Sequence, residues 1–182
     1  MKPASLALTT ARDNFRDRKI LVAGTFFRGG SSLDGVMTTT ATVDGSDATA
    51  KISGMVKKAF YTQLRAIMLN YIAVGGFNLI DIQRLNHETK IPVGIVMRSP
   101  PEAGRMKATL EKRGMRKKAA LIEKAGTIEK AGSMYVQLCS CSLQKASELI
   151  KISCTRSIIP ELIMVAHLIA AGIGLGESRG KA

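Results

Sequence analysis

The sequence predicts an α/β domain built on one mixed sheet with helices on both faces. Three observations indicate this class. The first 43 residues contain three short runs of apolar and β-branched residues, typical of strands. From residue 46 onward, segments with helical spacing of apolar residues alternate with strand-length apolar runs. A chain of 182 residues that is 46% hydrophobic is also large enough to bury one core.

The early strands are predicted at Ser5–Thr9, Ile20–Phe27 and Gly35–Val43. A polar, charged loop over 10–19 follows the first of them. Residues 28–32 read Arg-Gly-Gly-Ser-Ser, which is typical of a hairpin turn, so the second and third strands are expected to be antiparallel.

From residue 46 onward, the spacing of apolar residues changes from that of strands to that of helices alternating with strands. Ser46 or Asp47 is a good N-cap for a helix to about Phe60, and a strand is predicted at Leu64–Leu69. Asn78 can cap the next helix, with Asp81 as its capping-box partner, and Ile91–Met97 reads as a buried strand. An antiparallel start followed by parallel βα units is the arrangement of ribonuclease-H-like folds.

The rest of the chain is predicted to belong to the same domain, so that residues 1–182 form a single domain. Residues 100–132 are rich in Lys and Arg and read as a basic helical excursion on the surface. Tyr135–Cys139 is the last predicted strand. Ser142 caps a helix to about Ser153, and Pro160 opens another to about Ala171. The Gly-rich tail, 173–182, is expected to be flexible.

The charge indicates an anionic partner. There are 27 Lys and Arg against 14 Asp and Glu, a net charge of +13. Nucleic acid, DNA or RNA, is the first candidate and an acidic membrane surface the second. A basic protein without a specific partner is the alternative. Aromatic residues make up only 4% of the chain, so folds that bind bases on aromatic platforms are poorly supported.

The sequence favours a cytoplasmic protein with no membrane segment. Residues 1–10 lack the apolar core of a signal peptide, and the apolar run Leu162–Leu175 is shorter than the roughly 18 residues of a membrane span. The three cysteines match no common zinc spacing and are expected to be reduced thiols. His167 lies among apolar neighbours and is interpreted as a core or interface residue.

Several stretches together resemble the endonuclease V superfamily, and more closely its uncharacterised archaeal branch catalogued as domain of unknown function ninety-nine. These stretches cover most of the chain: LDGVMTTTATVDGSDAT (33–49), RAIMLNYIAVGGFNLIDIQRLNHET (65–89), IPVGIVMR (91–98), SLQKASELIKISCTRSIIPELIMVAHLIAAG (142–172) and GESRGKA (176–182). The resemblance implies a ribonuclease-H-like fold. It also implies Mg²⁺-dependent phosphodiester hydrolysis near a deaminated base, which needs several carboxylates.

This chain departs from the family pattern at most of the family's catalytic positions. The first and third family acids fall on Thr9 and Asn70, and Asp44 alone matches the second. The family lysine falls near Arg98, and its histidine falls near Cys139. We therefore expect only weak Mg²⁺ or Mn²⁺ binding at Asp44, unless Asp13, Asp17 or Asp81 supplies a relocated ligand.

The expected function is nucleic-acid binding by an endonuclease-V-like protein with a degenerate metal site. Phosphate contacts are expected from Arg98 and from the excursion, namely Arg105, Lys107, Arg113, Arg116, Lys117 and Lys118, with Arg12, Arg16 and Arg18 as further candidates. Two alternatives stay open. One is an active Mg²⁺- or Mn²⁺-dependent endonuclease with an altered ligand set, and the other is a protein-interaction module on the same fold.

Overall fold

The mixed α/β fold is confirmed. The computed structural model describes residues 4–10, 18–58 and 61–178. Seven strands form one sheet in the order β3-β2-β1-β4-β7-β9-β8. Their bounds are β1 Ala4–Thr10, β2 Lys19–Arg28, β3 Ser32–Thr42, β4 Leu64–Leu69, β7 Val93–Met97, β8 Glu129–Ala131 and β9 Met134–Cys139; a separate two-stranded hairpin contains β5 Ala73–Val74 and β6 Asn78–Leu79.

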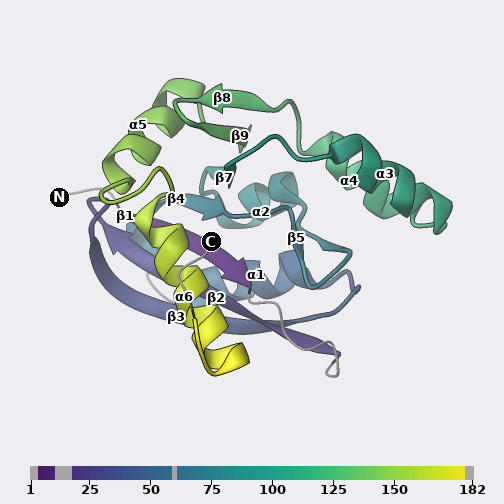
Figure 1. Ribbon diagram of the computed structural model, residues 1–182, viewed down its shortest axis with the longest axis horizontal. Coiled ribbons are helices and arrows are strands. Elements are labelled where there is room, and N and C mark those ends of the chain that lie inside the picture. The colour runs from purple at the N-terminus through teal and green to yellow at the C-terminus, as the bar shows by residue number, and fades with distance from the viewer. Residues whose placement is uncertain (1–3, 11–17, 59–60, 179–182) are drawn as a thin grey trace.

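The helices cover both faces of the sheet. They are α1 Ala48–Lys58, α2 Ile82–Thr89, α3 Ala103–Lys112, α4 Arg116–Lys124, α5 Leu143–Ser153 and α6 Glu161–Leu175, with a short 3-10 turn at Tyr61–Gln63. Apolar side chains of α1 and α2, such as Ile52 and Leu85, pack against one face. Ile150 of α5 and Leu162 of α6 pack against the other. Figure 1 shows α6 lying across the strands β1 and β2.

The strand directions agree with the predicted order over the first five strands. β1 pairs antiparallel with β2, and β2 pairs antiparallel with β3. β1 then pairs parallel with β4, and β4 pairs parallel with β7. The chain direction of β1, β4 and β7 is therefore the same, and their C-terminal ends meet along one side of the sheet, here called the carboxyl edge.

The far side of the sheet differs from the prediction of further parallel units. β9 runs antiparallel to β7, and β8, which falls inside the predicted excursion, pairs antiparallel with β9. A tight turn containing Gly132, with φ of 64°, joins β8 to β9. Such a short connection can join only antiparallel strands, so no crossover helix is formed there.

Residues 103–124 form a helical hairpin, here called the arm, that projects from the side of the molecule (Figure 1). Leu110, Ala119 and Ile122 of the arm pack with Leu79 in a small apolar cluster. The arm therefore rests on the β5–β6 hairpin rather than on the main sheet. At the other end of the chain, α6 continues through Leu175, so residues 173–175 of the predicted tail are helical.

The prediction that Asn78 caps α2 is wrong. Asp81 is the N-cap of α2, and its carboxylate accepts a hydrogen bond from the Arg84 N–H at 2.9 Å. Asn78 lies in β6, where it is fully buried, and its carbonyl oxygen accepts the Ala48 N–H at the start of α1 at 3.1 Å. An asparagine distant in sequence thus satisfies a free N–H of α1.

We expect the turn between β2 and β3 to depend on a glycine at position 30. Gly30 has φ of 83°, and a Cβ there would overlap the backbone carbonyl of Ile152 in α5. Gly132 has a similar φ of 64°, but open space surrounds it. Gly132→Ala should cost only the left-handed backbone penalty, about 1 kcal/mol. Gly30→Ala should cost about 2 kcal/mol more, since the turn must also shift away from α5.

Denaturant unfolding of the two variants measures that difference. Equal losses of unfolding free energy in Gly30→Ala and Gly132→Ala would contradict the close packing of the turn on α5.

Candidate functional site

Thr9 and Asn70 lie side by side at the carboxyl edge. Leu8 pairs with Leu69 across the parallel strands β1 and β4, and the Asn70 N–H donates to the Leu8 carbonyl at 3.2 Å. Thr9 is buried and Asn70 is half-buried. Arg98 directly follows β7, the next strand along the same edge. The structure therefore gathers three of the predicted site positions at the carboxyl ends of parallel strands, where α/β proteins commonly bind ligands.

Side-chain alternation places Thr9 and Asn70 on the same face. Ala7 and Met68 both pack in the apolar cluster under α5 and α6. Thr9 and Asn70 each follow by two residues, and residues two apart in extended chain share a face. A hydroxyl and an amide thus stand together at the two positions where the resemblance implies carboxylates.

Asp44 lies at the tip of the β5–β6 hairpin. Its N–H donates to the Gly75 carbonyl at 2.8 Å, and its carboxylate accepts the Phe77 N–H at 2.7 Å. Thr10 of β1 and Thr39 of β3 both pair with Val22 of β2, so they lie at the same height in the sheet. Asp44 follows Thr39 by five residues and lies beyond the end of β3. No hydrogen bond or ion pair within the described ranges joins Asp44 to Thr9 or Asn70. The Asp44 carboxylate is instead bound to the turn of the hairpin, through the Phe77 N–H.

Asp47 is held by hydrogen bonds that fix it as a structural carboxylate. It accepts the Thr42 N–H at 3.0 Å, the Thr42 hydroxyl at 2.9 Å and the Asn78 amide at 2.6 Å. Partial burial raises the pKa of the Asp47 carboxyl, but these hydrogen bonds outweigh burial and hold the pKa below its usual value. Asp47 directly precedes α1, and its side chain binds β3 and β6.

Asp81, one of the predicted relocated ligands, is also engaged. Besides capping α2, its carboxylate accepts a hydrogen bond from Lys124 of the arm at 2.6 Å. Burial raises the pKa of the Asp81 carboxyl, and the Lys124 ammonium and the Arg84 N–H lower it further than burial raises it. Asp81 therefore joins α2 to the arm. Asp13 and Asp17, the other predicted ligands, lie outside the described residues, as do Arg12 and Arg16.

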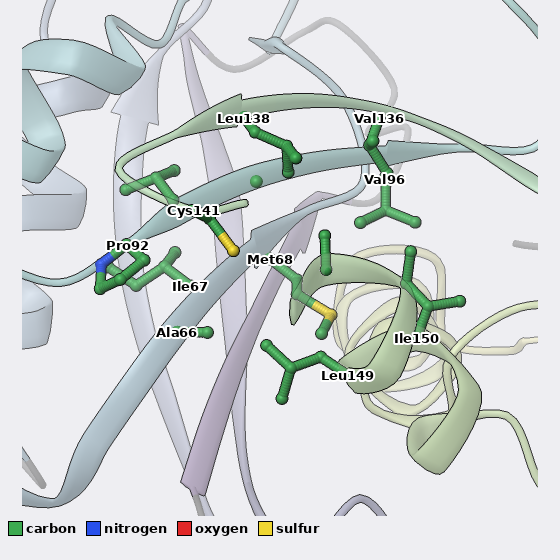
Figure 2. A pocket seen from close by; sticks show the side chains of 13 residues that line it. Ala66, Ile67, Met68, Pro92, Val96, Val136, Leu138, Cys141, Leu149 and Ile150 are labelled. Carbon is green, nitrogen blue, oxygen red and sulfur yellow. The ribbon is translucent and has the colours of Figure 1, made fainter. Parts of the chain in front are cut away.

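Cys139, at the predicted histidine position, is distant from Thr9 and Asn70 in the sheet. It pairs with Val93 at the beginning of β7, because β9 runs antiparallel to that strand. Cys139, Cys141 and Cys154 are all free thiols. The Cys141 sulfur faces a small apolar cavity of about 20 Å³ under α5 (Figure 2). Burial raises the pKa of the Cys141 thiol, which disfavours the thiolate needed for nucleophilic chemistry.

The arm brings part of its charge to the hairpin tip. The Lys118 ammonium donates to the Asp44 carbonyl at 2.6 Å, and the Arg113 guanidinium lies over the Phe77 ring, 5.2 Å from its centre. Arg116 and Lys117 are exposed at the start of α4. Lys107 and Arg105 are less available, because Lys107 pairs with Glu111 and Glu123, and Arg105 pairs with Glu102.

His167, interpreted from the sequence as a core or interface residue, belongs to α6. It is half-buried on α6, one turn before Ala170 and Ala171, which pack against Ala23. Ala23 is the β2 partner of Thr9. The spacing of four residues from Ile163 and Ala171 places His167 on the helix face directed at the sheet.

The described residues do not fit the metal centre that the resemblance implies. Within residues 4–10, 18–58 and 61–178, no three His, Cys, Asp or Glu side chains come close enough to share an ion. Thr9 and Asn70 offer neutral oxygens, while the carboxylates of Asp47 and Asp81 are occupied by hydrogen bonds and an ion pair. We therefore derive no reaction step through a metal.

The sequence model of the endonuclease dU family matches residues 7–174. The chain belongs to this family. A UPF0215 protein of Methanosarcina acetivorans is 40% identical over 190 residues, covering all of this chain and 97% of the relative. A UPF0215 protein of Methanothermobacter thermautotrophicus is 45% identical over 172 residues, covering 91% of this chain and 84% of the relative. The predicted kinship with an uncharacterised archaeal branch is confirmed.

Solved structures confirm the fold of this endonuclease dU family chain. A protein of unknown function from Archaeoglobus fulgidus superimposes with a TM-score of 0.86 at 36% identity, over 94% of this chain and 98% of that one. Human endonuclease V superimposes with a TM-score of 0.61 at 10% identity, over 96% of this chain and 85% of that one. A third structure is endonuclease V of Ciona intestinalis in complex with a 24mer DNA containing an inosine followed by a ribo-adenosine. Its TM-score is 0.58 at 12% identity, over 91% of this chain and 82% of that one. The expected endonuclease-V-like, ribonuclease-H-like architecture is therefore present.

The helices of the described chain include none that is both long enough and apolar enough to span a membrane.

Asp47→Asn should lower the unfolding free energy by about 2 kcal/mol at neutral pH, because an amide cannot accept hydrogen bonds at both ends. The folded-state pKa of Asp47 lies below its model-compound value of 3.8, so the carboxylate stabilises the fold above that value. This contribution is lost as the pH falls through the lower folded-state pKa. The stability gap between wild type and Asp47→Asn should therefore shrink below pH about 4.

Denaturant unfolding at neutral and acidic pH checks this expectation. Asp34→Asn is the control, since Asp34 pairs with Arg28 at the surface and should contribute less than about 1 kcal/mol. A gap between wild type and Asp47→Asn that is as wide at acidic as at neutral pH would contradict the assigned role of Asp47.

Proposed function

We propose that this member of the endonuclease dU family binds nucleic acid and is impaired as a metal-dependent phosphodiesterase. The observation that carries the proposal is the neutral pair Thr9 and Asn70 at the centre of the carboxyl edge. Without charged ligands at these two positions, a hard divalent cation lacks the oxygen anions that would hold it against a phosphate.

The distribution of basic residues supports a polyanionic ligand. Arg98 lies at the carboxyl edge, and the arm adds Arg113, Arg116, Lys117 and Lys118 around the hairpin tip. A groove lined by Lys or Arg attracts phosphate groups and gives affinity that falls steeply with salt. The crystallised complex of Ciona endonuclease V with DNA supports the same class of ligand for this fold.

A second candidate function is a working metal-dependent endonuclease with an altered ligand set. The family description, endonuclease dU, favours it. So does the exposed position of the Asp44 carboxylate, of which only one oxygen accepts a hydrogen bond from the described residues. Asp13 would be a further ligand in this case.

Loss of two arm charges should weaken nucleic-acid binding. In fluorescence polarisation at low salt with EDTA, Arg116→Gln combined with Lys117→Gln should weaken binding of labelled DNA or RNA by about tenfold. The slope of log affinity against log salt should also become less negative by about two, because two phosphate contacts are removed.

Lys145→Gln combined with Lys151→Gln is the matched control, since it removes the same charge from α5, on the other side of the molecule (Figure 1). Equal weakening of binding by both double variants would show that the effect depends on net charge alone and not on the position of the charges. Failure of wild type to bind any DNA or RNA would favour a protein-interaction role instead.

Restoring the two carboxylates tests the chemical part of the proposal. Thr9→Asp combined with Asn70→Asp should create Mn²⁺-dependent cleavage of end-labelled DNA or RNA that wild type lacks. Thr9→Asn is the control, because it matches the shape of aspartate without its charge. Cleavage by wild type that disappears in Asp44→Ala would instead establish the altered ligand set.

A further inference from the structure

The strand β3 leaves one edge of the seven-stranded sheet open, at the opposite end of the strand order from β8 (Figure 1). It is 11 residues long. Among the described residues, no segment other than β2 forms backbone hydrogen bonds with residues 33–41. Alternate residues of an edge strand direct their N–H and carbonyl groups away from the neighbouring strand, so β3 presents a row of donors and acceptors to which a further strand can pair.

Residues 36–42 lack the features that usually keep such an edge from pairing. They include no Lys, no Pro and no charged residue, and the register shift against β2 lies nearer the start of β3, at Phe26 and Phe27. The Val36 side chain is 45% exposed, and Thr38 and Thr40 on the same face are exposed as well. β-branched side chains of this kind stabilise cross-strand pairs, so they favour a further strand at this edge.

A groove of about 380 Å³ lies beside this edge, between β3 and α1. Met37 and Thr39 of β3 line one wall, and Lys51, Gly54 and Lys58 of α1 line the other. The spacing of three and four residues places these α1 positions on one face of the helix. A Cβ at Gly54 would meet no atom within 4 Å, so the space between the two lysines is open.

The two lysines give the groove a positive charge. Neither Lys51 nor Lys58 forms an ion pair with another described residue. The acid within β3, Asp34, is already paired with Arg28. A second copy of this chain would bring the same lysines and a further net charge of +13, so the charge favours an acidic partner over self-pairing.

The spacing of the lysines fits carboxylates on an added strand. Thr39 pairs with Val22, which packs in the same apolar cluster as Ile52 of α1, so every second side chain of an added strand would lie on the α1 face. Same-face side chains of a strand recur about every 7 Å. Lys51 and Lys58 are about 10 Å apart along the helix axis. Because lysine side chains are long and flexible, two successive carboxylates on that face can each meet one ammonium group.

We propose that β3 accepts, as an added strand at its open edge, an extended segment of a partner protein with acidic side chains at alternate positions. The backbone of that segment pairs with β3, and its carboxylates lie in the groove against Lys51 and Lys58. The inference is independent of the proposed nucleic-acid binding, since that proposal assigns no role to β3 or α1.

The first test measures the charge requirement. The probe is a labelled peptide of about nine residues in which Glu alternates with Val or Thr. In fluorescence polarisation with the full chain at low salt, it should bind saturably, and the same peptide with Gln in place of Glu should bind about tenfold more weakly. Lys51→Gln combined with Lys58→Gln should weaken binding of the Glu peptide by about the same factor, whereas Lys145→Gln combined with Lys151→Gln, on α5, should leave it unchanged.

The second test measures backbone pairing. Two versions of the Glu peptide carry N-methyl groups, one on its Glu residues and the other on its Val and Thr residues. Because alternate N–H groups of a strand face opposite edges, one version should keep the affinity and the other should lose it. Hydrogen exchange of alternate β3 amides, followed by NMR, should slow when the unmodified peptide binds.

Several outcomes would overturn the proposal. These are the absence of saturable binding of the Glu peptide up to about 1 mM, equal weakening by the two double variants, and equal affinity of the two N-methylated peptides. A dimer of wild type in light scattering that Val36→Lys disperses would assign the edge to a second copy. A DNA or RNA strand that displaces the peptide and loses affinity in the Lys51→Gln, Lys58→Gln variant would assign the groove to nucleic acid.

Discussion

The amide of Asn78 is the interaction on which the geometry around the candidate site depends. It is fully buried, and it donates to the Thr42 carbonyl and to Asp47 while accepting the Ala48 N–H. One side chain thereby joins the end of β3, the start of α1 and the β5–β6 hairpin. Each of these polar groups would otherwise be unpaired in or near the core, which costs about 1–3 kcal/mol for each group. The hairpin, and with it Asp44, is fixed by this network.

The same network engages one of the described carboxylates near the hairpin, and an ion pair engages another. Asp47 is committed to Thr42 and Asn78, and Asp81 is committed to α2 and Lys124. Moving either side chain toward a cation would break charge-assisted hydrogen bonds that hold helices in place. Thr9 and Asn70 remain at the edge as neutral polar groups. In the proposed function, the basic residues that attract phosphate are Arg98 and those of the arm.

The arm links the basic surface to the hairpin and to α2. It is attached to the hairpin by a small apolar cluster, by Lys118 bound to the Asp44 carbonyl and by Arg113 over Phe77, and to α2 by Lys124 bound to Asp81. Its own acids pair with Arg105 and Lys107, so its charge is concentrated at the start of α4. α3 also forms one wall of a cavity of about 330 Å³ beside the sheet, lined from this helix by Ala103, Arg105, Met106 and Thr109.

The sequence by itself determined the α/β class, the antiparallel start of the sheet, the alternation of strands and helices, and the presence of neutral residues, Thr9 and Asn70, at two strand ends. These features depend on local periodicity, turn residues and residue identity, which are present in the chain before it folds. The tertiary structure decided which helix Asn78 serves, the direction of β9, the place of Asp44 at the hairpin tip and the cavity beside the arm. Each of these depends on contacts between segments distant in sequence, such as Asn78 with Ala48 or Lys118 with Asp44, whose geometry no local pattern encodes.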